Sequence, residues 1–110
     1  MLRLRFTTSI LTLIEAERAF IRAERLGHSS TKQTKKMRTT LNTAKSEWII
    51  LSLNEAVQRQ SVQHFPVEPI RTLDALHLAS AVVMLAAFPD LKVLTFDQRI
   101  VENARFLKLL

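Results

Sequence analysis

Three acidic residues stand where carboxylates can do chemistry: Glu15, Asp74 and Asp97. Glu15 falls in the second turn of an expected helix, Asp74 opens a strongly apolar helix, and Asp97 follows an expected strand. In open α/β sheets, ligand sites gather at the carboxyl ends of strands, which favours Asp97. Mg²⁺ and Mn²⁺ prefer oxygen ligands, and grouped carboxylates need a cation to offset their repulsion. Such a site can activate water to attack a phosphodiester.

Each of the three acids also has a structural interpretation. Glu15 can form an ion pair with Arg18, which stands three residues further along the same expected helix. Asp74 can cap the helix that it opens, where a negative charge suits the positive end of the helix dipole. Asp97 can cap the helix that follows it. The residue types alone leave both interpretations open.

The helix that carries Asp74 organises the rest of the chain. From Leu73 to Ala87 there is no Gly or Pro, and Ala and Leu dominate, so the pattern predicts about four helical turns. The segment is apolar nearly all round, which favours burial on several sides. Its polar residues Asp74, His77 and Ser80 share a stripe roughly 120° wide at about 100° per residue. We interpret His77 as a packed residue, because carboxylate sites for Mg²⁺ rarely use imidazole.

Expected helices and strands alternate along the chain. Gly27 is typical of a helix end and Asn54 of a helix start, and Pro66 and Pro69 bracket an irregular connection. This alternation predicts one α/β domain over residues 1–110, with parallel strands. The expected strands are 2–6, 48–53 and 92–96, and the other expected helices are 10–26, 32–45, 55–63 and 99–109, with cap-type residues at 7–9.

The composition narrows the classes of function. The chain of 110 residues has no Cys, which excludes thiolate metal sites, and it has no Gly-rich phosphate loop. No apolar run is long enough to span a membrane, and the start lacks the apolar core of a signal peptide, so we expect a cytoplasmic protein without membrane contact. The net charge of +6 favours a polyanionic partner, either nucleic acid or an acidic protein. A solvated basic surface is the alternative.

The densest run of basic residues lies between positions 32 and 38. Both a solvated helix face and a nucleic-acid-binding surface fit such a run. Lys35, Lys36 and Arg38, together with Arg71 before the apolar helix, are the candidate nucleic-acid-binding residues. The hydroxyls of Ser9 and Thr95 are candidate hydrogen-bond donors to metal-binding carboxylates.

Three blocks of the sequence, within a span from about residue 8 to 107, resemble motifs of one known family. Residues 9–23 contain Ser9-Ile-Leu-Thr-Leu-Ile-Glu15, residues 71–81 contain Arg71-Thr-Leu-Asp74-Ala-Leu-His, and residues 93–99 contain Thr95-Phe-Asp97. In this order they are similar to the blocks with the second, third and fourth acids of the PIN-domain family, which includes the toxin ribonucleases of toxin–antitoxin pairs. Residues 48–53 match the family's intervening strand.

The resemblance implies a three-layer α/β fold, with a short, mainly parallel sheet flanked by helices. It implies hydrolysis of RNA phosphodiesters that depends on Mg²⁺ or Mn²⁺, with Glu15, Asp74 and Asp97 as catalytic and metal-binding residues. It also implies a small antitoxin protein whose acidic or amphipathic segment covers the basic face of the site.

The chain departs from the family pattern at its amino end. A PIN domain opens with a central strand that ends in its first acid, but none of the fourteen residues before Glu15 is Asp or Glu. We therefore expect a fold that is incomplete at the N-terminus, with an open sheet edge that favours a homo-oligomer. We also expect weak metal binding and little ribonuclease activity. The alternative is a non-catalytic PIN remnant that acts only as a folded or protein-binding module.

Overall fold

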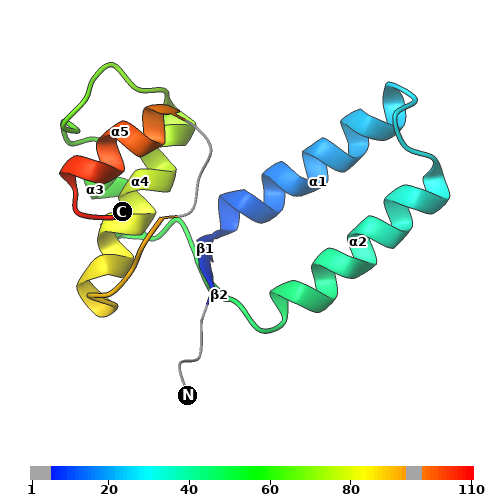
Figure 1. Ribbon diagram of the computed structural model, residues 1–110, viewed down its shortest axis with the longest axis horizontal. Coiled ribbons are helices and arrows are strands. Elements are labelled where there is room, and N and C mark those ends of the chain that lie inside the picture. Colours follow the sequence, from blue (N-terminus) through cyan, green and yellow to red (C-terminus); the bar gives the residue numbers. More distant parts are fainter. Residues whose placement is uncertain (1–5, 94–97) are drawn as a thin grey trace. The chain divides into compact units, whose positions relative to one another are not determined.

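A computed structural model describes residues 6–93 and 98–110, except for the side chain of Arg99. Within these residues, five helices and two short strands follow one another in the order β1, α1, α2, β2, α3, α4, α5 (Figure 1). The chain groups into two compact units, residues 1–51 and residues 52–110. The prediction of a mixed α/β chain with parallel strands is confirmed. The three-layer PIN-like arrangement and the single domain stay predictions.

The first unit is a parallel strand pair joined by a helical hairpin. Strand β1 (Thr7–Ser9) pairs with β2 (Ile49–Leu51), with Thr7 opposite Ile49. Parallel strands need a long crossover connection. Helices α1 (Ile10–Arg25) and α2 (Thr31–Lys45) supply it and run side by side (Figure 1).

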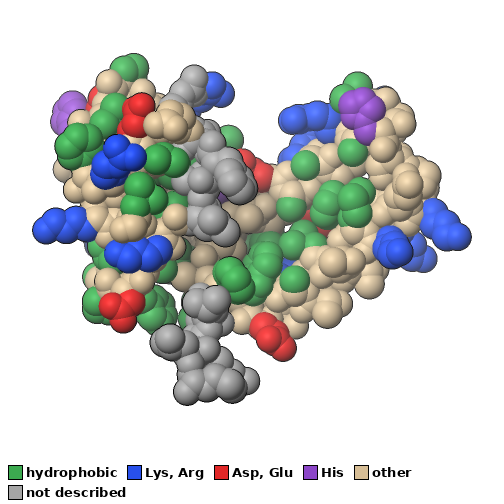
Figure 2. All heavy atoms as spheres, viewed as in Figure 1, with side chains coloured by type: hydrophobic (Ala, Val, Ile, Leu, Met, Phe, Trp, Pro, Cys, Tyr) green, Lys and Arg blue, Asp and Glu red, His purple; other side chains and the backbone are tan. Residues whose placement is uncertain are grey.

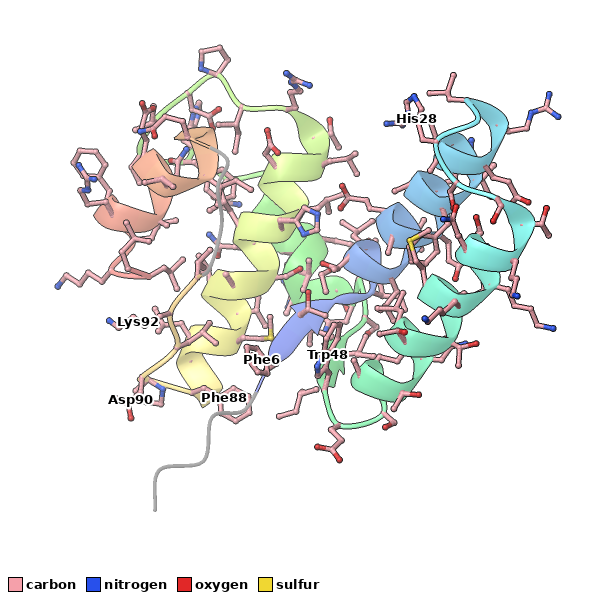
Figure 3. All side chains as sticks on the ribbon, turned by 45° about the vertical axis from the view of Figure 1, so that its right-hand side comes forward. Phe6, His28, Trp48, Phe88, Asp90 and Lys92 are labelled. Carbon is pink, nitrogen blue, oxygen red and sulfur yellow. The ribbon has the colours of Figure 1, made fainter. Side chains whose placement is uncertain are left out.

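Aromatic residues mark the start of both strands in the first unit. Phe6 and Trp48 lie at the same end of the strand pair, where the Ile49 N–H donates to the Phe6 carbonyl at 3.0 Å (Figure 3). His28 lies in the turn at the far end of the hairpin (Figure 3). The two helices therefore extend away from the sheet.

Local capping sets the ends of the hairpin helices. The Ser9 side chain accepts a hydrogen bond from the Leu11 N–H at 3.1 Å and so begins α1. Helix α1 ends with Gly27 in the left-handed region at φ 75°, a conformation that glycine adopts without strain. Ser30 and Gln33 form a reciprocal capping box at the start of α2.

The second unit is built around the apolar helix α4 (Thr72–Ala87). Helices α3 (Glu55–Ser61) and α5 (Gln98–Phe106) both pack against it (Figure 1). Asn54 caps α3 by accepting from the Val57 N–H, as the sequence predicts. None of the described helices is long and apolar enough to cross a membrane. The buried apolar side chains of this unit are Val57, Phe65, Ala75, Leu78, Ala79, Ala81, Met84, Ala104 and Leu109.

The strand predictions need correction. Residues 7–9, which the sequence marks as cap residues, form β1, because Thr7 and Thr8 are β-branched and suit an extended backbone. Ser9 is both the last strand residue and the helix cap. Most of the strand predicted at 2–6 and residues 94–96 of the one predicted at 92–96 lie outside the described residues. Phe6, Lys92 and Val93 are not in strands.

Candidate functional site

Asp74 is the most informative of the predicted site residues. It is half-buried in the first turn of α4, a helix that is otherwise almost entirely apolar. The N-cap of α4 is Arg71, and no side chain forms a capping hydrogen bond there. Among the described residues, the ion pairs join Glu17 with Arg38 and Glu55 with Arg59, so Asp74 takes part in none. Asp74 stands in the first turn of α4, where a negative charge suits the helix dipole, so both interpretations of Asp74, as a structural cap and as a site acid, stay open.

A clamped loop positions the start of α4. The Glu68 carboxylate accepts hydrogen bonds from the backbone N–H groups of Phe65 and Ile70 at 2.9 and 3.0 Å. The fully buried Asn103 of α5 accepts from the Val67 N–H at 2.8 Å and donates to the Val67 carbonyl at 2.9 Å. These two polar side chains fix the loop between α3 and α4, and with it the start of α4, the helix whose first turn contains Asp74.

The role of Asn103 was missed from the sequence. One signal could have indicated it: Asn103 stands four residues before Leu107 and next to Ala104, on the apolar side of an amphipathic helix. A polar residue at such a position needs a hydrogen-bond partner. Its partner Val67 is 36 residues away in sequence, so the pairing itself could not be read from the local pattern.

Glu15 is exposed in the second turn of α1, as the sequence predicts. The expected ion pair between Glu15 and Arg18 is not among the ion pairs of the described residues. The neighbouring Glu17 is the acid of α1 that forms an ion pair, with Arg38 of α2. The interpretation of Glu15 as the partner of Arg18 stays a prediction.

The remaining predicted site residues are only partly described. Asp97 and Thr95 lie outside the described residues. The Ser9 oxygen is buried and accepts the capping hydrogen bond of α1, and its predicted contact with a carboxylate stays a prediction. Glu15 belongs to the first unit and Asp74 to the second. In the part of the chain that the structure describes, no three His, Asp or Glu side chains gather as a metal site, and the convergence of the three acids stays a prediction.

The candidate nucleic-acid-binding residues fall into two groups. Lys35, Lys36 and Arg71 are exposed. Arg38 is engaged within the hairpin: its Nε donates to both oxygens of Glu17, at 2.8 and 3.1 Å, and its guanidinium lies 5.8 Å from the centre of the Phe20 ring. A guanidinium held by a carboxylate and an aromatic ring is less available for phosphate. Arg38 therefore serves the packing of α1 on α2.

The positive charge is confined to one unit. Residues 1–51 contain ten of the sixteen Lys and Arg and four of the ten acidic residues, which gives +6. Residues 52–110 contain six of each and are neutral. Figure 2 shows Lys and Arg side chains over the outer edge of α2 and over the carboxyl-terminal half of α1. The first unit is therefore the one that attracts a polyanion.

One cavity of about 230 Å³ lies in the second unit, between the end of α3 and the first turn of α4. The lining includes apolar side chains and one carboxylate, Glu68, which is already bonded by two backbone N–H groups. Asp74 does not line it. The lining residues are Ser61, Val62, Phe65, Glu68, Ile70, Thr72 and Ala75. A single, already bonded carboxylate does not make a metal site.

Comparisons with protein-family models, with curated proteins and with solved structures found no match. The resemblance to the PIN-domain family therefore stays a prediction from the sequence blocks around Glu15, Asp74 and Asp97.

Proposed function

We propose that this protein is a PIN-like chain that binds RNA and a divalent metal ion, and that its reaction is hydrolysis of RNA phosphodiesters. Glu15, Asp74 and Asp97 are the carboxylates of the site. The observation that supports the proposal most is Asp74: a half-buried acid in the first turn of an otherwise apolar helix whose N-cap residue makes no side-chain hydrogen bond. The oxygen atoms of a carboxylate at this position suit a divalent cation as ligands.

The roles follow from the residue types. Carboxylate oxygens are the ligands for Mg²⁺ or Mn²⁺, and the bound ion supplies an activated water and stabilises the leaving oxygen. Lys35, Lys36 and Arg71 are exposed cations that attract the RNA strand. An acidic protein partner competes for the same positive surface, and the chain forms a homo-oligomer.

The metal part is tested by thermal unfolding with Mn²⁺ in the millimolar range. Mn²⁺ at ten times its Kd stabilises the wild type by about 1.4 kcal/mol, which raises the Tm by several degrees. Asp74→Asn abolishes the shift. The matched control is Asp90→Asn, which removes an exposed acid in the turn after α4 (Figure 3) and leaves the shift intact. A shift that survives in the double variant Asp74→Asn/Asp97→Asn means that the ion binds elsewhere.

The catalytic part is tested by incubating labelled RNA with the chain and Mn²⁺. We expect slow or undetectable cleavage, because three acids are one fewer than the family's four, and losing one member of a catalytic group can lower the rate by several orders of magnitude. Cleavage that needs Mn²⁺ and disappears in Asp74→Asn and Asp97→Asn supports an enzyme in which three acids suffice.

The alternative function is a non-catalytic binding module, in which the three acids do not suffice for hydrolysis. Intact RNA under all metal conditions, together with a Tm shift that Asp74→Asn abolishes, supports this alternative. If the wild type shows neither a Tm shift with Mn²⁺ nor cleavage of RNA, the proposed metal site is contradicted.

A further inference from the structure

Three arginines form a row along one side of α1. At about 100° per residue, Arg18, Arg22 and Arg25 fall within an arc of about 60°. All three side chains are exposed. The row follows from the i, i+4, i+7 spacing in the sequence, and the folded hairpin leaves it in contact with solvent.

The acids of α1 beyond Glu15 are turned towards α2 and do not neutralise this row. Glu17 is bonded to Arg38 at 2.8 Å, and the Glu24 carboxylate accepts a hydrogen bond from the Thr31 hydroxyl at 2.6 Å. Neither of the two ion pairs among the described residues involves an arginine of the row. The row therefore keeps its three charges for a partner outside the hairpin.

The row leads along the helix to Glu15. With a rise of about 1.5 Å per residue, Arg18, Arg22 and Arg25 lie about 4.5, 10.5 and 15 Å along the axis from Glu15. Glu15 falls within about 80° of each of them around the helix. At the rise of about 3.4 Å per nucleotide that a strand has in a double helix, this length corresponds to about four nucleotides, and to fewer in an extended strand. A charged strand that lies along the row therefore reaches the carboxylate at its end.

We propose that the arginine row of α1 binds consecutive backbone phosphates of a single RNA strand and directs that strand to Glu15. This inference rests on the proposed function, because it gives Glu15 its place in the site. Arginine suits the role, since its planar guanidinium binds phosphate through two parallel hydrogen bonds. The exposed Ile14 and Ile21 flank the row and offer apolar contact to riboses and bases. Phosphate contacts carry no sequence information, so the binding is non-specific for sequence.

Helix α2 provides a matched comparison within the same unit. Lys32, Lys35 and Lys36 are exposed and carry the same total charge as the arginine row. Helix α2 contains no acidic residue, so its lysines lead to no candidate metal ligand. Lysines also bind phosphate as point charges, without the paired geometry of arginine. The lysines therefore attract RNA over a distance, whereas the arginine row fixes its position.

The experiment measures binding of a fluorescently labelled single-stranded RNA of about twelve nucleotides by anisotropy, in EDTA at 50 to 200 mM salt. The first variant is Arg18→Gln/Arg22→Gln/Arg25→Gln, and the charge-matched control is Lys32→Gln/Lys35→Gln/Lys36→Gln. We expect the arginine variant to weaken binding at least tenfold at 50 mM salt and the lysine variant less than threefold. The slope of log K against log salt should fall by about 2 in the arginine variant.

Three results would overturn this inference: equal losses in the two variants, a larger loss in the lysine variant, or no RNA binding by the wild type. A conservative variant, Arg18→Lys/Arg22→Lys/Arg25→Lys, keeps the charge and should recover part of the affinity. If it binds as weakly as the Gln variant while its Tm is lower by more than a few degrees, lost folding explains the effect and the inference fails. If the arginine variant loses binding of polyglutamate but not of RNA, the partner of the row is an acidic protein and the inference fails.

The proposed function and this inference fail in different measurements. EDTA removes metal chemistry, so the binding assay does not depend on cleavage. Asp74→Asn should lose the Mn²⁺ shift, and Asp90→Asn, which lies outside both the site and the row, should keep the shift and the RNA affinity. A chain that binds RNA through the row but shows no Mn²⁺ shift contradicts the metal site alone. A chain with the shift but without row-dependent RNA binding contradicts the row alone.

Discussion

The first unit, residues 1–51, carries the whole net charge of the chain, whereas the second unit, residues 52–110, carries most of its buried side chains. Among the described residues, Leu11 is the only buried hydrophobic residue of the first unit. Exposed apolar residues of the hairpin include Ile14, Ile21 and Met37. The second unit instead encloses α4 between α3 and α5.

This difference indicates that one unit supplies most of the stability and the other most of the binding surface. Burial of apolar area is the main favourable term in folding, so the second unit supplies most of the stability. Isolated helices of about 15 residues are marginal in water, so α1 and α2 depend on their caps and on the pair of Glu17 with Arg38. Because few side chains of the hairpin are buried, its Lys and Arg side chains stay exposed and can contact a partner.

The largest expected effect tests the core of the second unit. Leu78 is 1% exposed, and Leu78→Ala should lower the free energy of unfolding by about 2–5 kcal/mol, because it removes buried contacts and leaves a cavity. Leu73→Ala, on the same helix but at a position that is 49% exposed, should cost less than about 1 kcal/mol. Urea unfolding followed by circular dichroism measures both. Equal losses would mean that burial of side chains against α4 is not what stabilises the second unit.

The second effect tests whether Asn103 is needed to hold the loop between α3 and α4. Asn103→Ala leaves the Val67 N–H and carbonyl without their partner and should lower the free energy of unfolding by about 2 kcal/mol. Amide hydrogen exchange at Val67 should become faster in this variant. Asn42→Ala removes an exposed amide from α2 and serves as the control, with a change within about 0.5 kcal/mol. Unchanged exchange at Val67 would mean that the clamp is not needed.

A third change tests whether the two units open independently of each other. Ser30→Ala removes the capping box of α2 and should destabilise that helix by about 1 kcal/mol. Hydrogen exchange should then accelerate in α2 and remain unchanged in α4, because local openings follow local contacts. The exposed Ser52 of the second unit, changed to Ala, is the control. An equal acceleration in both helices would indicate that the chain opens as one unit.

The smallest effect concerns the ion pair within the hairpin. Glu17→Gln should cost about 0.2–1 kcal/mol, because the side chains of Arg38 and Glu17 are 39% and 42% exposed and the pair is screened by water. Unfolding at 20 and 500 mM NaCl measures the salt dependence, which should shrink in the variant. Glu47→Gln, which neutralises an exposed acid in the same unit, is the control. A loss well above 1 kcal/mol would mean that the ion pair, rather than capping, holds the hairpin together.

The sequence by itself determined most of the helices and their ends. Helix α4 follows from fifteen residues without Gly or Pro, and Gly27, Asn54 and the hydroxyl of Ser9 act where local chemistry favours them. These features depend on neighbours within about four residues, which any local pattern contains. The position of Asp74 in the first turn of α4 was predictable for the same reason.

Only the tertiary structure decided which of these residues are engaged. In the sequence, Arg38 could not be distinguished from its basic neighbours. Its hydrogen bond to Glu17, 21 residues away, shows that Arg38 joins α2 to α1. The clamp of Asn103 on Val67 joins positions 36 residues apart, and β1 is extended next to a strand more than forty residues later. Such contacts form between segments that are distant in sequence, so local sequence patterns cannot predict them.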